Sequence, residues 1–137
     1  MAAYVDRLQR HGFRQWCHLI ADTEAELHAI AQRCGLRRIW YQSLCHASFP
    51  HYDAQERIRS RLVAVGAIEV TARELGAHMA RIRVELEAGR WSIPGSACPM
   101  CRGRGWFVGE CHPQEECGTC AGTGVVPRSE HVPSRNV

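Results

Sequence analysis

Hydrophobic residues along the first two thirds of the chain fall into short runs and helical stripes, separated by glycines and capping residues. The short apolar runs predict strands at residues 3–5, 15–20, 38–42 and 67–70. Apolar positions at helical spacing predict three helices that begin near Asp22-Thr23, Asp53 and Thr71, each a residue type suited to capping. Strands alternating with helices predict a small α/β domain, with a partly parallel sheet of about four strands and three helices.

The composition changes near Ala88, where glycine, proline and serine replace the apolar periodicity. The rest of the chain contains a cluster of cysteines and ends in a proline-containing stretch with few apolar residues. These changes predict four parts: an α/β domain at 1–88, a linker at 89–96, a cysteine-rich module with a hairpin at 97–126, and a flexible tail at 127–137.

Charge and hydropathy narrow the class of protein. All 17 basic residues are arginine, 14 residues are acidic and the net charge is only +3, so charge alone gives little reason to expect non-specific nucleic-acid binding. Asp6, Arg7 and Arg10 interrupt any secretory leader, and no apolar run is long enough to cross a bilayer. We therefore expect a cytoplasmic protein that does not contact membranes. Its cysteines are then expected to be thiols and metal ligands instead of disulfides.

The strongest motif is a repeated CxxCxGxG pattern in the C-terminal part. Two residues between cysteines let one tight turn direct both sulfurs at one metal ion, and the glycines permit the positive φ angles of such a turn. The alternative of idle thiols or adjacent disulfides fits the repeated spacing less well. Cys111 and His112, between the repeats, could replace a ligand, but a free loop thiol is favoured. The pattern predicts one structural zinc ion bound by Cys98, Cys101, Cys117 and Cys120.

The two CxxCxGxG units, at about residues 97–125, resemble half of the cysteine-rich region of DnaJ co-chaperones, whose four repeats bind two zinc ions. The chain has neither a His-Pro-Asp tripeptide nor the helical pattern of a J-domain. The resemblance therefore implies a zinc-binding module and not a co-chaperone that stimulates Hsp70.

Basic and aromatic residues alternate beside the first repeat, at Arg102, Arg104, Trp106 and Phe107. Arg102, Arg104 and Trp106 could contact phosphates and stack on a base of a nucleic acid. Alternatively, the aromatic residues simply cover the zinc site, and this simpler interpretation is slightly favoured.

The N-terminal part resembles the bacterial and phage family known as domain of unknown function 4031. The resemblance spans about residues 3–80 and rests on the segments Tyr4-Val5-Asp6, Trp16 to Asp22, Glu26-Leu27-His28, His51-Tyr52-Asp53 and Ala67 to Leu75. It implies a small α/β domain and brings no established activity.

Histidine and aspartate residues concentrate near the expected strand ends of this domain. If the strands are parallel neighbours, their polar residues could converge at one sheet edge as a divalent-metal or acid–base cluster for hydrolysis. Arg73 could then bind an anionic substrate group. The competing interpretation assigns the aspartates to helix caps and turns, and it carries more weight. The candidate catalytic residues are Asp6, His18, His51, Asp53 and Arg73.

Two functions therefore remain open from the sequence. The favoured one is a zinc-containing binding or adaptor protein that contacts nucleic acid or a partner protein, because the only strong motif is structural. The alternative is a small metal-dependent hydrolase of a phosphoester or nucleotide, acting through the histidine and aspartate residues. An arginine-rich surface with aromatic residues is also compatible with homo-oligomers.

Overall fold

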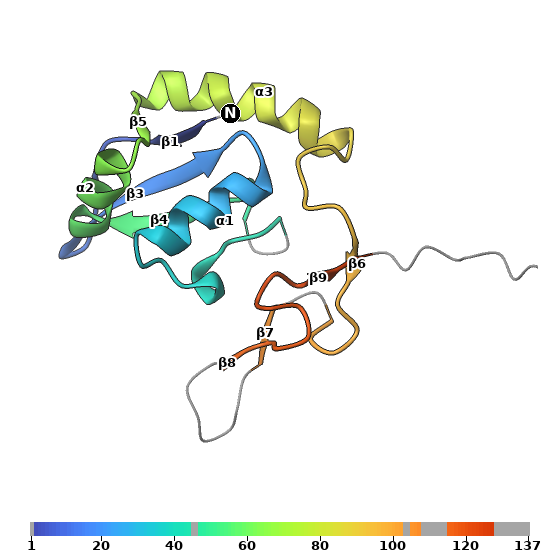
Figure 1. Cartoon of the computed structure of the whole chain (residues 1–137). Helices are drawn as coiled ribbons and strands as arrows, with labels where there is room; N and C mark the ends of the chain where they lie inside the picture. Colours follow the sequence, from blue (N-terminus) through green and yellow to red (C-terminus); the bar gives the residue numbers. More distant parts are fainter. Residues whose placement is uncertain (1, 45–46, 103–104, 108–114, 128–137) are drawn as a thin grey trace, which may run out of the picture. The chain divides into compact units, whose positions relative to one another are not determined.

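The computed structural model describes residues 2–44, 47–102, 105–107 and 115–127. The chain folds as two compact units, Met1–Ile93 and Pro94–Val137. The first unit contains the sheet and the three helices, and the second contains four short strands around the cysteines (Figure 1).

A five-stranded mixed sheet forms the centre of the first unit, with β3 as its longest strand. One edge of β3 pairs first with β2 and then with β1, while the other edge pairs with β4; all three pairings are antiparallel. The pairing of β1 with β5 is parallel. The strands are β1 (Ala3–Val5), β2 (Gln9–His11), β3 (Arg14–Ala21), β4 (Tyr52–Gln55) and β5 (Ile68–Glu69).

Three helices complete this unit: α1 (Glu24–Arg33), α2 (Glu56–Ala64) and α3 (Ala72–Glu87). The Thr23 side chain caps α1 by accepting a hydrogen bond from the amide of Glu26. Thr71 and Glu74 form a reciprocal capping box at the start of α3, which satisfies two amides that the helix cannot pair internally. These caps fix where α1 and α3 leave the sheet.

The helices cover the two faces of the sheet unequally. On one face, His28 of α1 contacts Tyr52, which lies opposite the buried Leu19. On the other face, α3 covers Tyr4, whose ring stacks on His78. The sheet lies between α1 and α3 (Figure 1). Because α3 contacts the face at β1, the part of the same face formed by the start of β3 and by β4 is free to form a site.

The core of the first unit extends to its last residues. Val5, Leu19, Leu27, Leu62 and Ile82 are fully buried. Trp91, inside the stretch predicted as a linker, is only 3% exposed. Its indole N–H donates to the carbonyl of Ala21.

The fold class is confirmed as mixed α/β with three helices, but two local predictions were wrong and two strands, β2 and β4, were not predicted. Residues 38–42 were expected to form a strand, whereas Arg38–Trp40 is a 3-10 helix. Asp53 does not cap a helix, because it lies within β4 and Gln55 precedes α2. The edge strand β2 was not predicted, since Gln9–His11 contains no apolar residue and is exposed on both faces.

The second unit contains two small antiparallel ladders. The strands β6 (Ser96–Ala97) and β9 (Val125–Val126) form one, and β7 (Trp106–Phe107) and β8 (Glu115–Glu116) form the other. Its buried cluster consists of the four cysteines, with Val126 packed against them. None of the described helices is both long and apolar enough to traverse a lipid bilayer.

Candidate functional site

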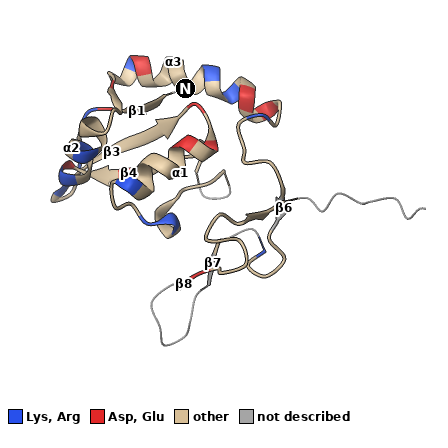
Figure 2. Cartoon of the chain, viewed as in Figure 1, with Lys and Arg blue, Asp and Glu red and all other residues tan. Residues whose placement is uncertain are grey.

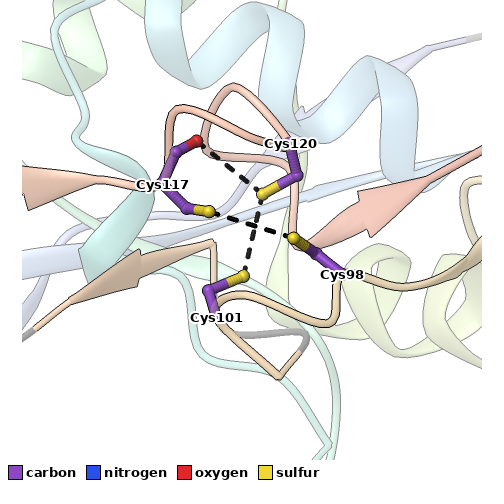
Figure 3. Close-up of side chains that lie close together, drawn as sticks. All are labelled: Cys98, Cys101, Cys117 and Cys120. Carbon is purple, nitrogen blue, oxygen red and sulfur yellow. Dashed lines mark hydrogen bonds between the residues drawn. The ribbon is translucent and has the colours of Figure 1, made fainter.

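Four buried cysteines of the second unit converge on one point (Figure 3). The sulfurs of Cys98 and Cys117 are 3.9 Å apart, and those of Cys101 and Cys120 are 3.7 Å apart. A tetrahedral zinc site with bonds of about 2.3 Å has sulfur–sulfur edges of about 3.8 Å. A disulfide would require a sulfur–sulfur distance of about 2.05 Å. The cluster therefore fits a single metal ion, and four thiolates are the donor set of structural zinc.

The two CxxCxGxG repeats have matching geometry. The amide of Gly105 donates to the sulfur of Cys101 at 3.1 Å, and that of Gly124 donates to Cys120 at 3.1 Å. The repeats also exchange backbone hydrogen bonds, because each first cysteine donates its amide to the last glycine of the other repeat, at 2.9 Å in both cases. Such amide–sulfur bonds favour the thiolate form, which binds metal.

Backbone amides also act on Cys117. Burial alone would raise the pKa of this thiol, but hydrogen bonds from the backbone of Cys120 and Thr119 lower it to about 7. The thiolate of Cys117 is thus accessible near neutral pH, before any metal ion adds its own charge.

The residues predicted to contact a macromolecule are only partly described. Arg102 is exposed and has a φ angle of 53°. Trp106 lies in β7, whereas Arg104 falls outside the described residues. Cys111 and His112, considered as substitute ligands, also fall outside them.

A second cluster lies in the first unit, on the sheet face that β3 and β4 leave open. His18 of β3 is directly opposite Asp53 of β4, so their side chains share a face. On the other edge of β3, the amide of Asp6 donates to the carbonyl of His18. Asp6, the residue after β1, therefore forms a row with His18 of β3 and Asp53 of β4, and His51 joins the row from the residues just before β4.

Antiparallel pairing, and not the expected meeting of parallel strand ends, brings these residues together. His18 Nε2 is 3.9 Å from Asp53 Oδ1, and His51 Nε2 is 3.4 Å from the same oxygen. Each of the three residues has a ligand atom within 4.8 Å of the other two. Ligand atoms at about 2.1 Å from a common ion lie roughly 3.0–3.5 Å apart, so the distance from His51 to Asp53 suits a common ion and that from His18 to Asp53 is slightly longer.

The other ring nitrogens of both histidines already have acceptors. His18 Nδ1 lies 2.8 Å from Asp6 Oδ2, and His51 Nδ1 lies 2.7 Å from the carbonyl oxygen of Phe49. A carboxylate or carbonyl acceptor at Nδ1 favours the proton there, which leaves the Nε2 lone pair available. Gln42 donates to Asp53 Oδ2 at 2.6 Å and leaves Oδ1 facing the imidazoles.

The cluster opens into a pocket. The pocket has a volume of about 390 Å³ and is lined by His11, Trp16, His18, Gln42, His51 and Asp53. The His18 and Asp53 side chains are 36% and 38% exposed, in contrast with Asp6 at 2%. The site thus combines solvent-accessible ligand atoms with a buried carboxylate behind them, an arrangement found in open metal sites.

Hydrogen bonding sets the protonation of these groups. The bond to Asp6 raises the pKa of His18 above its ordinary value, against the effect of burial. Burial would raise the pKa of Asp6, but its bonds to the side chain and backbone of His18 lower it. The contact with His51 lowers the pKa of Asp53. Both carboxylates are therefore ionised at neutral pH.

Four of the five candidate catalytic residues lie together in space, whereas Arg73 is not among the residues that line the pocket. Arg73 is exposed in the first turn of α3. Gln42 was not among the candidates, although it contacts Asp53 and pairs with His51 through an isolated β-bridge. Nothing in the sequence marked this pairing, because it joins two irregular segments.

Comparisons with known proteins identify the first unit only. Residues 3–82 match the family model described as "Protein of unknown function (DUF4031)". No curated protein and no solved structure is significantly similar to the chain. The second unit thus resembles DnaJ proteins in its cysteine spacing alone, and none of the comparisons matches it to a DnaJ protein. Since the matched residues make up more than half of the chain, the protein belongs to the DUF4031 family.

Proposed function

We propose that this protein is a metal-dependent hydrolase whose reaction centre is formed by His18, His51 and Asp53. The observation that carries this proposal is the convergence of two imidazole Nε2 atoms and one carboxylate oxygen in an open pocket. Both imidazoles are oriented through Nδ1, so the atoms that face the pocket are lone-pair donors.

The donor set supports hydrolysis. Three protein ligands leave coordination positions for water and substrate, unlike the four cysteines of the second unit. A divalent ion held there would lower the pKa of bound water and polarise a phosphoryl oxygen. In the net reaction a water oxygen bonds to phosphorus, the ester bond to the leaving oxygen breaks, and the leaving oxygen receives a proton.

Each residue of the site has a role in this proposal. Asp6 and the Phe49 carbonyl hold the two imidazole rings in the ligating tautomer. Gln42 fixes Asp53 so that one carboxylate oxygen faces the ion. Trp16 forms an apolar wall beside the ligands and could hold the part of the substrate that does not react.

The proposal also includes one structural zinc ion in the second unit, bound by Cys98, Cys101, Cys117 and Cys120. The closed set of four thiolates excludes substrate, and so small a unit has little other core. Its folding is therefore expected to depend on the metal.

Metal content and turnover of the full-length protein test the hydrolase. Protein loaded with zinc, manganese or iron(II) under anaerobic conditions is assayed with bis(p-nitrophenyl) phosphate. We expect His51→Ala to lose both the metal that is not held by cysteine and the activity. The matched control His78→Ala removes a histidine of α3 that stacks on Tyr4 and should retain both. Equal metal content and activity in the two variants would refute the proposal.

A binding role for the second unit is the second candidate function, and the exposure of Arg102 beside the zinc ligands favours it. In that case Arg102→Ala should weaken the binding of nucleic acid or of a protein partner while the zinc content stays unchanged. An unchanged affinity would remove the support that Arg102 gives to this role.

A further inference from the structure

Alternate residues of β3 present three different side chains along the face that contains the pocket. Arg14, Trp16 and His18 are separated by two residues each, so they point to the same side of the sheet at steps of about 6.6 Å. His18 is a proposed metal ligand, and Trp16 lines the same pocket. The arginine side chain, the tryptophan ring and the proposed metal ligand His18 thus follow one another along a single strand.

The hairpin formed by β2 and β3 extends this row. Its two-residue turn, Gly12-Phe13, has a φ angle of 61° at Gly12, which is the conformation that tight hairpin turns require. His11 is directly opposite Arg14, so both lie on the pocket face, and His11 also lines the pocket. Every residue from Gln9 to Gln15 is exposed.

The charged residues of this hairpin and its flanking residues are all basic. Residues 7–21 include Arg7, Arg10 and Arg14 and no acidic residue, and β3 shows no acidic position in Figure 2. Within the described part of the chain, Arg14 has no ion-pair partner. One exposed apolar residue needs no explanation in itself. Phe13, however, is fully exposed at the tip of this basic hairpin and directly precedes Arg14.

We propose that the β2–β3 hairpin binds single-stranded nucleic acid and leads it into the His18–His51–Asp53 pocket. In this arrangement Arg14, on the pocket face, contacts a backbone phosphate, Phe13 contacts a base at the hairpin tip, and a second base stacks on Trp16. Basic residues that follow a backbone, combined with aromatic side chains that stack on bases, characterise single-strand binding. An unpaired strand is required because the bases of a duplex are not available to the ring of Trp16.

Single-stranded nucleic acid is then the substrate class of the proposed hydrolase, and the cleavage step alone rests on that proposed function. The scissile bond is a phosphodiester. One water molecule supplies the oxygen that bonds to phosphorus, the bond from phosphorus to one sugar oxygen breaks, and that oxygen leaves as a hydroxyl. Cleavage therefore yields one strand ending in a phosphate and one ending in a hydroxyl, without a further reactant.

Fluorescence anisotropy of a labelled oligothymidylate with the full-length, zinc-loaded protein tests binding. We expect Arg14→Ala and Phe13→Ala each to weaken binding about 5-fold or more, and Arg14→Ala to reduce the slope of log K against log salt by about 1. The matched control Arg83→Ala removes an exposed arginine of α3 and should leave binding unchanged. Both hairpin side chains are exposed, so circular dichroism and melting temperature should not change.

Equal affinities of the Arg14→Ala and Arg83→Ala variants would overturn the proposal. So would equally tight binding of a duplex, or a hairpin-dependent preference for phosphatidylserine vesicles over the oligonucleotide, since a basic aromatic tip could also suit an anionic membrane.

Measuring cleavage of the oligonucleotide alongside its binding distinguishes a failure of this inference from a failure of the proposed function. His51→Ala should bind the oligonucleotide normally but not cleave it. Hairpin-dependent binding without cleavage by the wild-type protein would support the binding surface and count against the hydrolase. Turnover of bis(p-nitrophenyl) phosphate without oligonucleotide binding would support the hydrolase and overturn the substrate inference.

Discussion

Asp6 holds His18 by two atoms at once: Oδ1 accepts the backbone amide of His18 at 2.6 Å, and Oδ2 lies 2.8 Å from its Nδ1. The two contacts fix both the strand and the ring, so the direction of Nε2 follows from the position of a single buried carboxylate. Asp6 is therefore a positioning residue for the metal centre that we propose, although its own oxygens do not face the pocket.

Asp6→Asn should weaken metal binding at this centre without unfolding the domain. The asparagine amide can donate to His18 Nδ1, which moves the ring proton to Nε2 and removes the ligating lone pair. We expect affinity to fall about 10- to 100-fold, measured by competition with a chromogenic chelator after the cysteine site is filled. Gln9→Ala is the control, because Gln9 also contacts Asp6, at 2.9 Å, without touching His18. Equal losses in both variants would argue that general loosening around Asp6, and not the tautomer of His18, controls the metal.

Cys98→Ser should abolish the structural zinc site. Three thiolates and a hydroxyl bind zinc less tightly than four thiolates, and this unit has few apolar contacts to hold it together. Elemental analysis should show loss of the corresponding zinc, and limited proteolysis should cut the second unit while residues 1–93 remain intact. Cys111→Ser is the matched control and should keep its zinc. If Cys111→Ser loses the metal instead, Cys111 is a ligand and the assignment of the four sulfurs is wrong.

The sequence predicted the elements of the first unit best where local signals agreed with tertiary packing. The helix starts near Thr23 and at Thr71 depend on neighbours within a few residues, and both are confirmed. The segment at 38–42 failed because its apolar and aromatic residues suit a strand by propensity. In the structure, however, Trp40 is 48% exposed and the segment turns as a 3-10 helix.

The same difference between local signals and tertiary packing applies to the candidate sites. The cysteine cluster could be predicted from the sequence because its ligands come in two local repeats of fixed spacing. The histidine and aspartate cluster was only suggested, because the contacts of His18 with Asp6 and Asp53 depend on strand register. Register is set by pairing over long sequence distances, and the unpredicted strand β4 is the one that places Asp53.

Trp91→Ala should destabilise the first unit strongly, although the composition around residue 91 is that of a linker. The side chain is almost fully buried and its N–H is bonded to the carbonyl of Ala21. Loss of this side chain should cost about 3–5 kcal/mol in the free energy of unfolding, followed by urea titration of tyrosine and tryptophan fluorescence. Trp91→Phe keeps most of the volume but leaves the carbonyl unpaired, so about 1–3 kcal/mol is expected. A loss below about 1 kcal/mol for Trp91→Ala would place the end of the folded domain before this residue.

Asp22 should stabilise the first unit at neutral pH and lose this effect in acid. Burial would raise the pKa of its carboxyl, but hydrogen bonds from Arg81, the Ala2 amide and Tyr4 lower it. A carboxyl whose pKa is lower in the folded state stabilises that state above its unfolded pKa of about 3.9, and the effect fades as pH falls through the folded value. Asp22→Asn should therefore cost about 1 kcal/mol at pH 7 and little near pH 2, measured by urea unfolding at both pH values.

The ion pair with Arg81 is only part of this effect, since the Arg81 side chain is 51% exposed and solvent screens it. In an Arg81→Gln background, the cost of Asp22→Asn should shrink but persist, because the Ala2 amide still donates to the carboxylate at 2.9 Å. An undiminished cost would mean that Arg81 contributes nothing measurable. If Asp22→Asn no longer lowers the free energy of unfolding in this background, the whole effect comes from the ion pair and none from the hydrogen bond between Asp22 and the Ala2 amide.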